Sequence, residues 1–277
     1  MTGGRAGTWW RVGAAVVVLV LFAGPLLFMV SGSLREPGLP PPLTPELLPD
    51  PIALDNYGTA AALVGLGRAT LNSLLVAAVV VPLSVLVGSW AGLALTQLPA
   101  RLSRALVLVS LVALMVPLTA LLVPRFALFR TLGLTDTLVP LMAPALLAAS
   151  PLHVLVYWLA FRRIPAELYD ACRLEGTSPL VVWRRVAMPL VRPVTAAVAA
   201  LTFILTWANF LDPLVYIYRR DLFTVPLALR SLAQLDRTNY PLLLAGAVMA
   251  TVPALLAFAV AQRFFLHEHR GAGWLGR

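Results

Sequence analysis

The sequence has no lysine, and all 21 of its basic residues are arginines. An ATP-binding P-loop follows the pattern G-x-x-x-x-G-K-[ST], in which the lysine reaches the phosphates of the nucleotide. A chain without lysine has no residue for that role. We therefore expect that any ATP hydrolysis coupled to this protein takes place on another polypeptide.

Cysteine and the common catalytic motifs are also scarce or missing. Cys172 is the single cysteine, which excludes an internal disulfide. The sequence contains no H-E-x-x-H, no paired-cysteine motif and no nucleophile elbow. Its arginines are dispersed, with no aromatic-interleaved patch that could follow a phosphate backbone. We expect no metal site, no catalysis and no nucleic-acid partner for this chain.

Charged residues make up only 12% of the sequence, whereas 60% of it is hydrophobic and its mean hydropathy is +0.88. One soluble core cannot hide that much apolar surface, so lipid must be the solvent. A helix needs about 20 apolar residues to cross a bilayer. The sequence therefore predicts an all-α integral membrane protein with six transmembrane helices, at approximately 12–34, 69–97, 105–124, 138–161, 193–214 and 240–263.

The placement of the arginines predicts the topology of these spans. An even number of spans puts both termini on one side, and that side holds most of the arginines. By the positive-inside rule it is the cytoplasm. The segment 162–192 is then a cytoplasmic loop, whereas 215–239 and the proline-rich 35–68 lie outside the membrane as surface segments.

The cytoplasmic loop has the signals of two short helices joined by a sharp turn. Pro165 suits the first turn of a helix, and Gly176 tolerates the left-handed conformation at its end. Ser178 and Pro179 follow as the N-cap and first residue of a second helix. Such a hairpin can either pack on the ends of its own spans or present a surface to a partner.

Particular residues of this loop resemble the EAA loop of binding-protein-dependent ABC importers. An acidic-Ala-small triplet is followed by an acidic-Gly pair, an aromatic residue and Met-Pro. The triplet is Asp-Ala-Cys in place of the usual Glu-Ala-Ala, and Glu-Gly-Thr replaces Asp-Gly-Ala. The resemblance implies that the 165–188 hairpin docks on an ATPase subunit through Glu167, Asp170, Ala171, Cys172, Glu175, Gly176, Trp183 and Pro189.

Further segments are similar to the carbohydrate-uptake branch of that family, namely DNYGTAA from Asp55, NSLLVAA from Asn72 and WANFLDPLVYIYRRDLF from Trp207. Within that branch the chain resembles the smaller permease of maltose-type importers. The resemblance implies a single permease domain over 1–277 with the type I importer fold, in a bacterial or archaeal cytoplasmic membrane. It also implies a second permease subunit, two copies of an ATPase that binds ATP and Mg, and an extracytoplasmic binding protein.

Two groups of residues near the outer end of the fifth span are candidates for contact with solute or binding protein. Trp207, Asn209 and Asp212 offer an aromatic face and hydroxyl-bonding groups, which suit a sugar. A structural hydrogen bond by Asn209 explains that residue equally well. By resemblance the next loop reaches toward the binding protein, through Arg219, Arg220 and Asp221, although ordinary solvated charges account for these residues too.

His153 is the ionisable residue that falls near the middle of a predicted span. Intramembrane ionisable groups are costly and often mark ion pathways, but a lone histidine more often makes one interhelical hydrogen bond. Besides an importer permease, two classes therefore stay open. One is an ion-coupled secondary transporter or channel, and the other is a membrane-embedded transferase.

Overall fold

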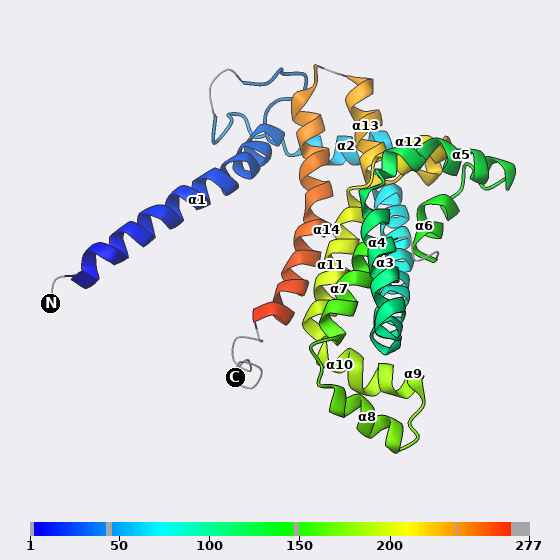
Figure 1. Cartoon of the computed structure of the whole chain (residues 1–277). Coiled ribbons are helices and arrows are strands. Elements are labelled where there is room, and N and C mark those ends of the chain that lie inside the picture. Colours follow the sequence, from blue (N-terminus) through cyan, green and yellow to red (C-terminus); the bar gives the residue numbers. More distant parts are fainter. Residues whose placement is uncertain (1–2, 43–45, 147–149, 237, 267–277) are drawn as a thin grey trace. The chain divides into compact units, whose positions relative to one another are not determined.

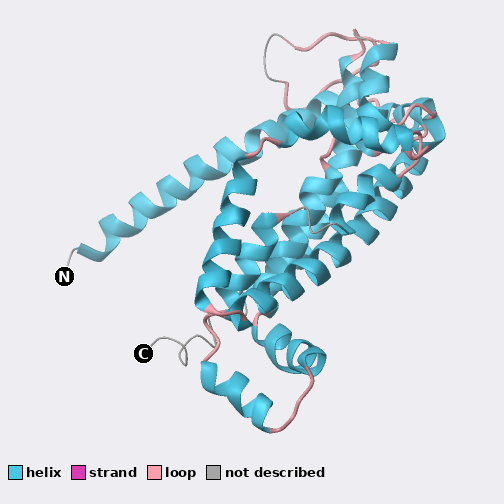
Figure 2. Cartoon of the chain, turned by 45° about the vertical axis from the view of Figure 1, so that its right-hand side comes forward, coloured by secondary structure: helices cyan, strands magenta, loops and turns pink. Residues whose placement is uncertain are grey.

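A computed structural model describes residues 3–42, 46–146, 150–236 and 238–266. Every element of regular secondary structure in these residues is a helix, and none is a strand (Figure 2). The all-α class predicted from the sequence is therefore confirmed. The predicted single domain contains two compact units, of which one comprises Met1–Gly67 with Ala228–Val252, and the other Arg68–Leu227 with Pro253–Arg277.

The first unit is built around a small apolar core. It contains α1 (Gly3–Ser33), α2 (Asp55–Val64), the first residues of α3 (Leu66–Gln97), the end of α13 (Val225–Leu235) and the first half of α14 (Tyr240–Leu266) (Figure 1). Its core residues come from α2, α13 and α14: Ala60, Leu232, Leu242 and Ala245. The apolar window of α1 is not buried within the chain, as expected for a helix that lipid or a partner surrounds.

A helix that was not predicted lies in the segment 35–68. Helix α2 begins at Asp55, whose carboxylate suits the positive N-terminal end, and it ends at Gly65 with a φ of +59°. Just inside it, the amide of the buried Asn56 donates to the carbonyls of Ser33 and Arg35, at 2.9 and 2.7 Å. These bonds tie α2 to the end of α1.

The second unit holds most of α3, the helices from α4 to η3, the first residues of α13 and the second half of α14. The loop that follows the C-terminal end of α7 leads into the N-terminal end of α11, and α7 packs against both α4 and α11. In chain order, after α3, the helices are α4 (Ala100–Met115), η1 (Leu118–Leu121), α5 (Leu122–Thr131), α6 (Val139–Leu146), α7 (Pro151–Phe161), α8 (Ala166–Leu174), α9 (Pro179–Val181), η2 (Val182–Ala187), α10 (Met188–Leu190), α11 (Arg192–Trp207), α12 (Leu211–Tyr216), η3 (Arg220–Leu222) and α13.

Three helices of the described chain are long and apolar enough to cross a membrane by themselves, Trp10–Ser33, Leu66–Gln97 and Tyr240–Arg263. Two bent pairs pass the same test together, Ala100–Met115 with Leu118–Thr131 and Pro179–Leu190 with Arg192–Trp207. Helix α7 is apolar but shorter. The three long helices overlap predicted spans, whereas Pro179–Leu190 lies in the predicted cytoplasmic loop, and the count of six spans stays a prediction.

The predicted span 105–124 is not one straight helix. Helix α4 stops at Met115, and the chain then bends by 84° into η1 and α5. Pro117 explains the break, because a proline disfavours the helical conformation of the residue before it, and Val116 is indeed extended at φ −74° and ψ 116°. The bend carries α5 away from the line of α4.

Helices α3 and α7 approach each other closely at two glycines of α3. A Cβ at Gly92 would lie 2.6 Å from the Cβ of Tyr157 and 2.8 Å from the backbone nitrogen of Trp158. At Gly88 it would lie 3.1 Å from the Cβ of His153. Small residues allow such contact between membrane helices, where packing rather than water drives association. Tyr157 is fully buried in the core beside this contact.

Candidate functional site

The loop after α7 forms the predicted helix, turn and second helix. Pro165 precedes α8, which ends in a Schellman motif: the N–H of Thr177 donates to the carbonyl of Cys172, and that of Gly176 to the carbonyl of Arg173, both at 3.0 Å. Gly176 has a φ of +66°, which confirms its predicted conformation. We call the segment Pro165–Leu190 the hairpin; it lies beyond the ends of α7 and α11 (Figure 1).

The second limb of the hairpin begins at Pro179 as predicted, and Ser178 occupies the N-cap position without a capping hydrogen bond from its side chain. Residues Val182–Ala187 are π-helical, and short π-helical segments occur frequently at functional sites. The limb from Pro179 to Leu190 meets α11 at 86°. If α11 crosses the bilayer, this limb lies along the membrane surface.

The tip of the hairpin is exposed and carries both acidic and apolar side chains. Glu167, Asp170, Ala171, Glu175 and Gly176 are exposed, whereas Cys172 and Pro189 are half-buried. Leu174 and Leu180 are 90% and 57% exposed on the same tip. These two leucines offer apolar area that a docked partner would cover.

The opposite side of the hairpin is anchored on the membrane helices. Trp183, one of the residues predicted to dock on the ATPase, points toward the membrane helices instead. Its Nε1 donates to the Oγ of Ser89 at 3.1 Å, and its ring contacts that of Trp90 edge-on, with the centroids 5.7 Å apart. Tyr169 lies in the same core, and burial raises the pKa of its hydroxyl to about 12, so it stays protonated. Sequence reasoning overlooked Tyr169, the aromatic residue of α8.

Removing the anchor should free the hairpin. Trp183 is half-buried against the core. Loss of a fully buried tryptophan costs about 3–5 kcal/mol in other proteins, so Trp183→Ala should cost part of that, whereas Trp183→Phe keeps a ring and loses one hydrogen bond worth about 1 kcal/mol. We expect trypsin to cut after the exposed Arg184 and Arg185 at least about tenfold faster in the alanine variant, with phenylalanine in between.

Mass spectrometry of limited digests measures these rates, and cleavage after Arg101, on the exposed start of α4, is the internal reference. Equal cleavage of the alanine variant and the wild type would show that Trp183 does not hold the hairpin.

A cavity of about 500 Å³ lies among α3, α5, α7 and α11 in the second unit. Most of its wall is aliphatic. Asn209 and Asp212, two of the three predicted solute-path residues, line it, and the Nδ2 of Asn209 donates to the carboxylate of Asp212 at 2.9 Å. The third, Trp207, is not among the described residues that line the cavity. It is 6% exposed, and its ring stacks on that of Phe203 with the centroids 5.7 Å apart.

His153 also lines this cavity while being 6% exposed. Its Nε2 lies 3.4 Å from the Oγ1 of Thr202, which is at the long end of a hydrogen bond. Its place on the cavity wall agrees with a histidine that lines a pathway, and its contact with Thr202 agrees with a histidine that makes one interhelical hydrogen bond. Arg125 lines the same cavity and was overlooked, because no sequence signal links the end of one predicted span to the end of another.

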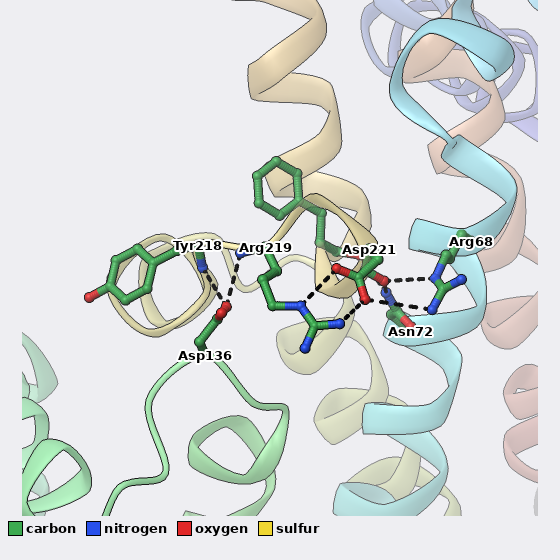
Figure 3. Close-up of polar contacts among 7 residues, drawn as sticks. Arg68, Asn72, Asp136, Tyr218, Arg219 and Asp221 are labelled. Atoms are coloured by element: carbon green, nitrogen blue, oxygen red, sulfur yellow. Dashed lines mark hydrogen bonds and ion pairs between the residues drawn. The ribbon is translucent and has the colours of Figure 1, made fainter.

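The predicted docking loop after α12 is held by a polar network (Figure 3). Asp136, at a φ of +57°, accepts hydrogen bonds from the backbone N–H groups of Tyr218 and Arg219, both at 2.9 Å. The Nε of Arg68 donates to the backbone carbonyl of Asp221 at 2.9 Å. The loop is thereby fixed to both α3 and the segment after α5.

The charged residues of that loop differ in whether they form ion pairs. Arg219 binds the carboxylate of Asp221, and this hydrogen bond lowers the pKa of Asp221, which stays ionised at neutral pH. Arg220 is exposed and has no ion-pair partner among the residues that the structure describes. Of the three predicted docking residues, Arg220 is the one whose charge is available to a partner.

A sequence model described as "binding-protein-dependent transport system inner membrane component" matches residues 84–266, well over half of the chain. The protein belongs to this family. The match covers the hairpin, the outer loop and all the residues that line the cavity except Val80. Membership confirms the resemblance found in the sequence and makes the chain an inner-membrane transport component rather than an enzyme.

Relatives of this permease include two sugar permeases. It is 34% identical to the arabinooligosaccharides transport system permease protein AraQ of Halalkalibacterium halodurans, over 79% of this chain and 78% of that protein. It is 32% identical to the lactose transport system permease protein LacG of Rhizobium radiobacter, over 79% of each.

The fold of the permease is that of a type I ABC importer subunit. It matches a chain of a bacterial ABC transporter involved in the import of the acidic polysaccharide alginate, with a TM-score of 0.77 and 19% identity, over 96% of this chain and 98% of that one. At this low identity the similarity shows only that the two chains share a fold.

Proposed function

We propose that this permease is one of two different membrane subunits of an ATP-driven importer of oligosaccharides. Its family depends on a binding protein, and the relatives above are named for arabino-oligosaccharides and lactose. We infer a saccharide of this class, delivered by an extracytoplasmic binding protein. A second permease and two copies of an ATPase subunit, which binds the ATP and Mg, complete the complex.

The hairpin is the observation that carries this proposal. Its tip presents Glu175, Gly176 and Leu174 to the surrounding medium, while Trp183 fixes its other face to α3. A partner that pushed on the tip would move α3 through Trp183 and α11 through the bend after Leu190. We infer that the ATPase dimer closes when it binds ATP and thereby pushes on the tip of the hairpin. The resulting movement of α3 and α11 switches the opening of the cavity from one side of the membrane to the other.

Coupling between the sites must be reciprocal, because each ligand shifts the same two states. A loaded binding protein on the outer loop should therefore raise ATP hydrolysis on the inner side. We assign to the exposed Arg220 a contact with that binding protein, with Arg219 and Asp221 shaping the loop.

The proposal is tested by isolating the complex that forms around the chain in its native membrane. Mass spectrometry should find a second permease, an ATPase and a binding protein. In proteoliposomes, uptake of radiolabelled arabinotriose or lactose should need ATP on the hairpin side and binding protein on the other. Without either component, uptake should fall to background.

The secondary-transporter alternative makes the opposite prediction. Vesicles that hold only this chain would then accumulate the saccharide under a proton or sodium gradient, and a His153→Gln variant would lose the pH dependence of uptake. Gradient-driven accumulation by the chain alone contradicts an ATP-driven importer.

A further inference from the structure

An ion pair on the wall of the membrane cavity has no role in the coupling described above. The Nη1 of Arg125, on α5, lies 3.4 Å from the Oδ1 of Asp212, on α12. Both residues line the cavity, and their side chains are 22% and 20% exposed. The 84° bend after α4 precedes α5, and without it Arg125 would continue along the line of α4.

The pair is poorly arranged for a structural role. Strong charge-assisted hydrogen bonds are about 2.7–2.9 Å long, shorter than this contact. The Nη2 of Arg125 is buried with no hydrogen-bond partner in the described part of the chain, which costs free energy. A hydrophobic pair would hold two helices as well as a buried ion pair does. Stability alone therefore does not explain these two charges.

The surroundings keep both groups in place at the cavity wall. The second carboxylate oxygen of Asp212 accepts from Asn209 at 2.9 Å. The guanidinium carbon of Arg125 lies over the ring of Tyr216, 5.9 Å from its centroid. A solute in the cavity would thus meet a fixed acceptor and a fixed donor side by side.

The charge of this wall is balanced. Among the described residues that line the cavity, Arg125 and Asp212 are the ones with formal charges at neutral pH, and they sum to zero. The other polar groups are hydroxyls, an amide and the imidazole of His153, from Ser84, Thr119, Ser150, Thr202, Thr206 and Asn209. Sugar hydroxyls can donate to a carboxylate and accept from a guanidinium, whereas a uronate would be repelled by Asp212.

We propose that Arg125 and Asp212 form a solute-contacting pair that favours neutral, hydroxyl-rich saccharides over acidic ones. The inference rests on the proposed function and narrows its substrate class. It sets this permease apart from the matched transporter that imports an acidic polysaccharide. Arg125 supplies the donor, and Asp212 both accepts hydroxyls and cancels the positive charge that would otherwise attract carboxylates.

The test measures solute binding to the native complex in nanodiscs without the binding protein, which would otherwise select the solute first. Lactose and arabinotriose are the neutral probes and trigalacturonate is the acidic one. Wild-type complex should bind a neutral probe more tightly than trigalacturonate. Asp212→Asn should raise the affinity for trigalacturonate at least about tenfold, because it leaves Arg125 with an uncancelled charge.

Arg125→Gln changes the cavity charge in the opposite direction and should make trigalacturonate binding undetectable while weakening neutral probes. Arg130→Gln is the matched control, since Arg130 lies on the same helix, is exposed and is not part of the described cavity wall. It should leave both affinities unchanged. Co-purification of all subunits with each variant shows that folding is intact.

An unchanged preference in Asp212→Asn and in Arg125→Gln overturns the inference, and so does a wild-type complex that binds no neutral probe or prefers the acidic one. ATP-dependent uptake by the same preparations separates this failure from failure of the proposed function. If wild-type uptake of a saccharide needs ATP while the variants keep the wild-type preference, the proposed importer function is supported. In that case Arg125 and Asp212 have no part in selecting the solute.

Discussion

Replacing Gly176 by aspartate should abolish uptake while leaving the protein folded in the membrane. Gly176 is exposed at the tip of the hairpin, and no heavy atom lies within 4 Å of where its Cβ would be. The φ of +66° is one that aspartate tolerates better than most residues do. The new carboxylate would therefore project from the tip into the surface on which the ATPase docks, and uptake by proteoliposomes should fall at least about a hundredfold.

Gly133 offers a matched control for this substitution. It has a φ of +68°, its Cβ position is equally open, and it lies at the end of α5 rather than on the hairpin. Gly133→Asp adds the same charge with the same backbone strain and should keep most of the uptake. Wild-type uptake by Gly176→Asp would refute docking of the ATPase at the tip.

Replacing Gly92 by alanine should prevent the second unit from packing correctly. The added methyl group would lie 2.6 Å from the Cβ of Tyr157, 2.8 Å from the nitrogen of Trp158 and 3.0 Å from the carbonyl oxygen of Val154. Two of these atoms belong to the backbone of α7, so α3 and α7 must move apart. Overpacking costs about 1–3 kcal/mol or more, and the core around Tyr157 would open.

The expected readouts are a lower yield of the chain in the membrane and a melting temperature several degrees lower, about what 1–3 kcal/mol produces. Gly67→Ala is the control, since it lies in the same helix and its Cβ position has no neighbour within 4 Å. If both variants melt with the wild type, α3 and α7 do not pack as closely as described.

Much of the hairpin could be derived from the chain because its signals are local. Pro165 and Pro179 fix their own φ angles and Gly176 tolerates a positive φ, and the first limb begins after Pro165 and ends at Gly176 while the second begins at Pro179. The run of charge-free residues likewise predicted where the long helices lie, since lipid tolerates few charges on any helix. By contrast, helix α2 in the segment 35–68 was overlooked amid its prolines.

The sequence by itself determined the helical class, the membrane environment, the family and the position of the hairpin. The tertiary structure decided which side chains work together: it turned Trp183 inward to Ser89 and brought Arg125 beside Asp212. Composition and local backbone preference act within a few residues, so they can be read along the chain. Contacts between distant residues depend on how helices bend and cross, as at Pro117, and that is settled only when the whole core packs.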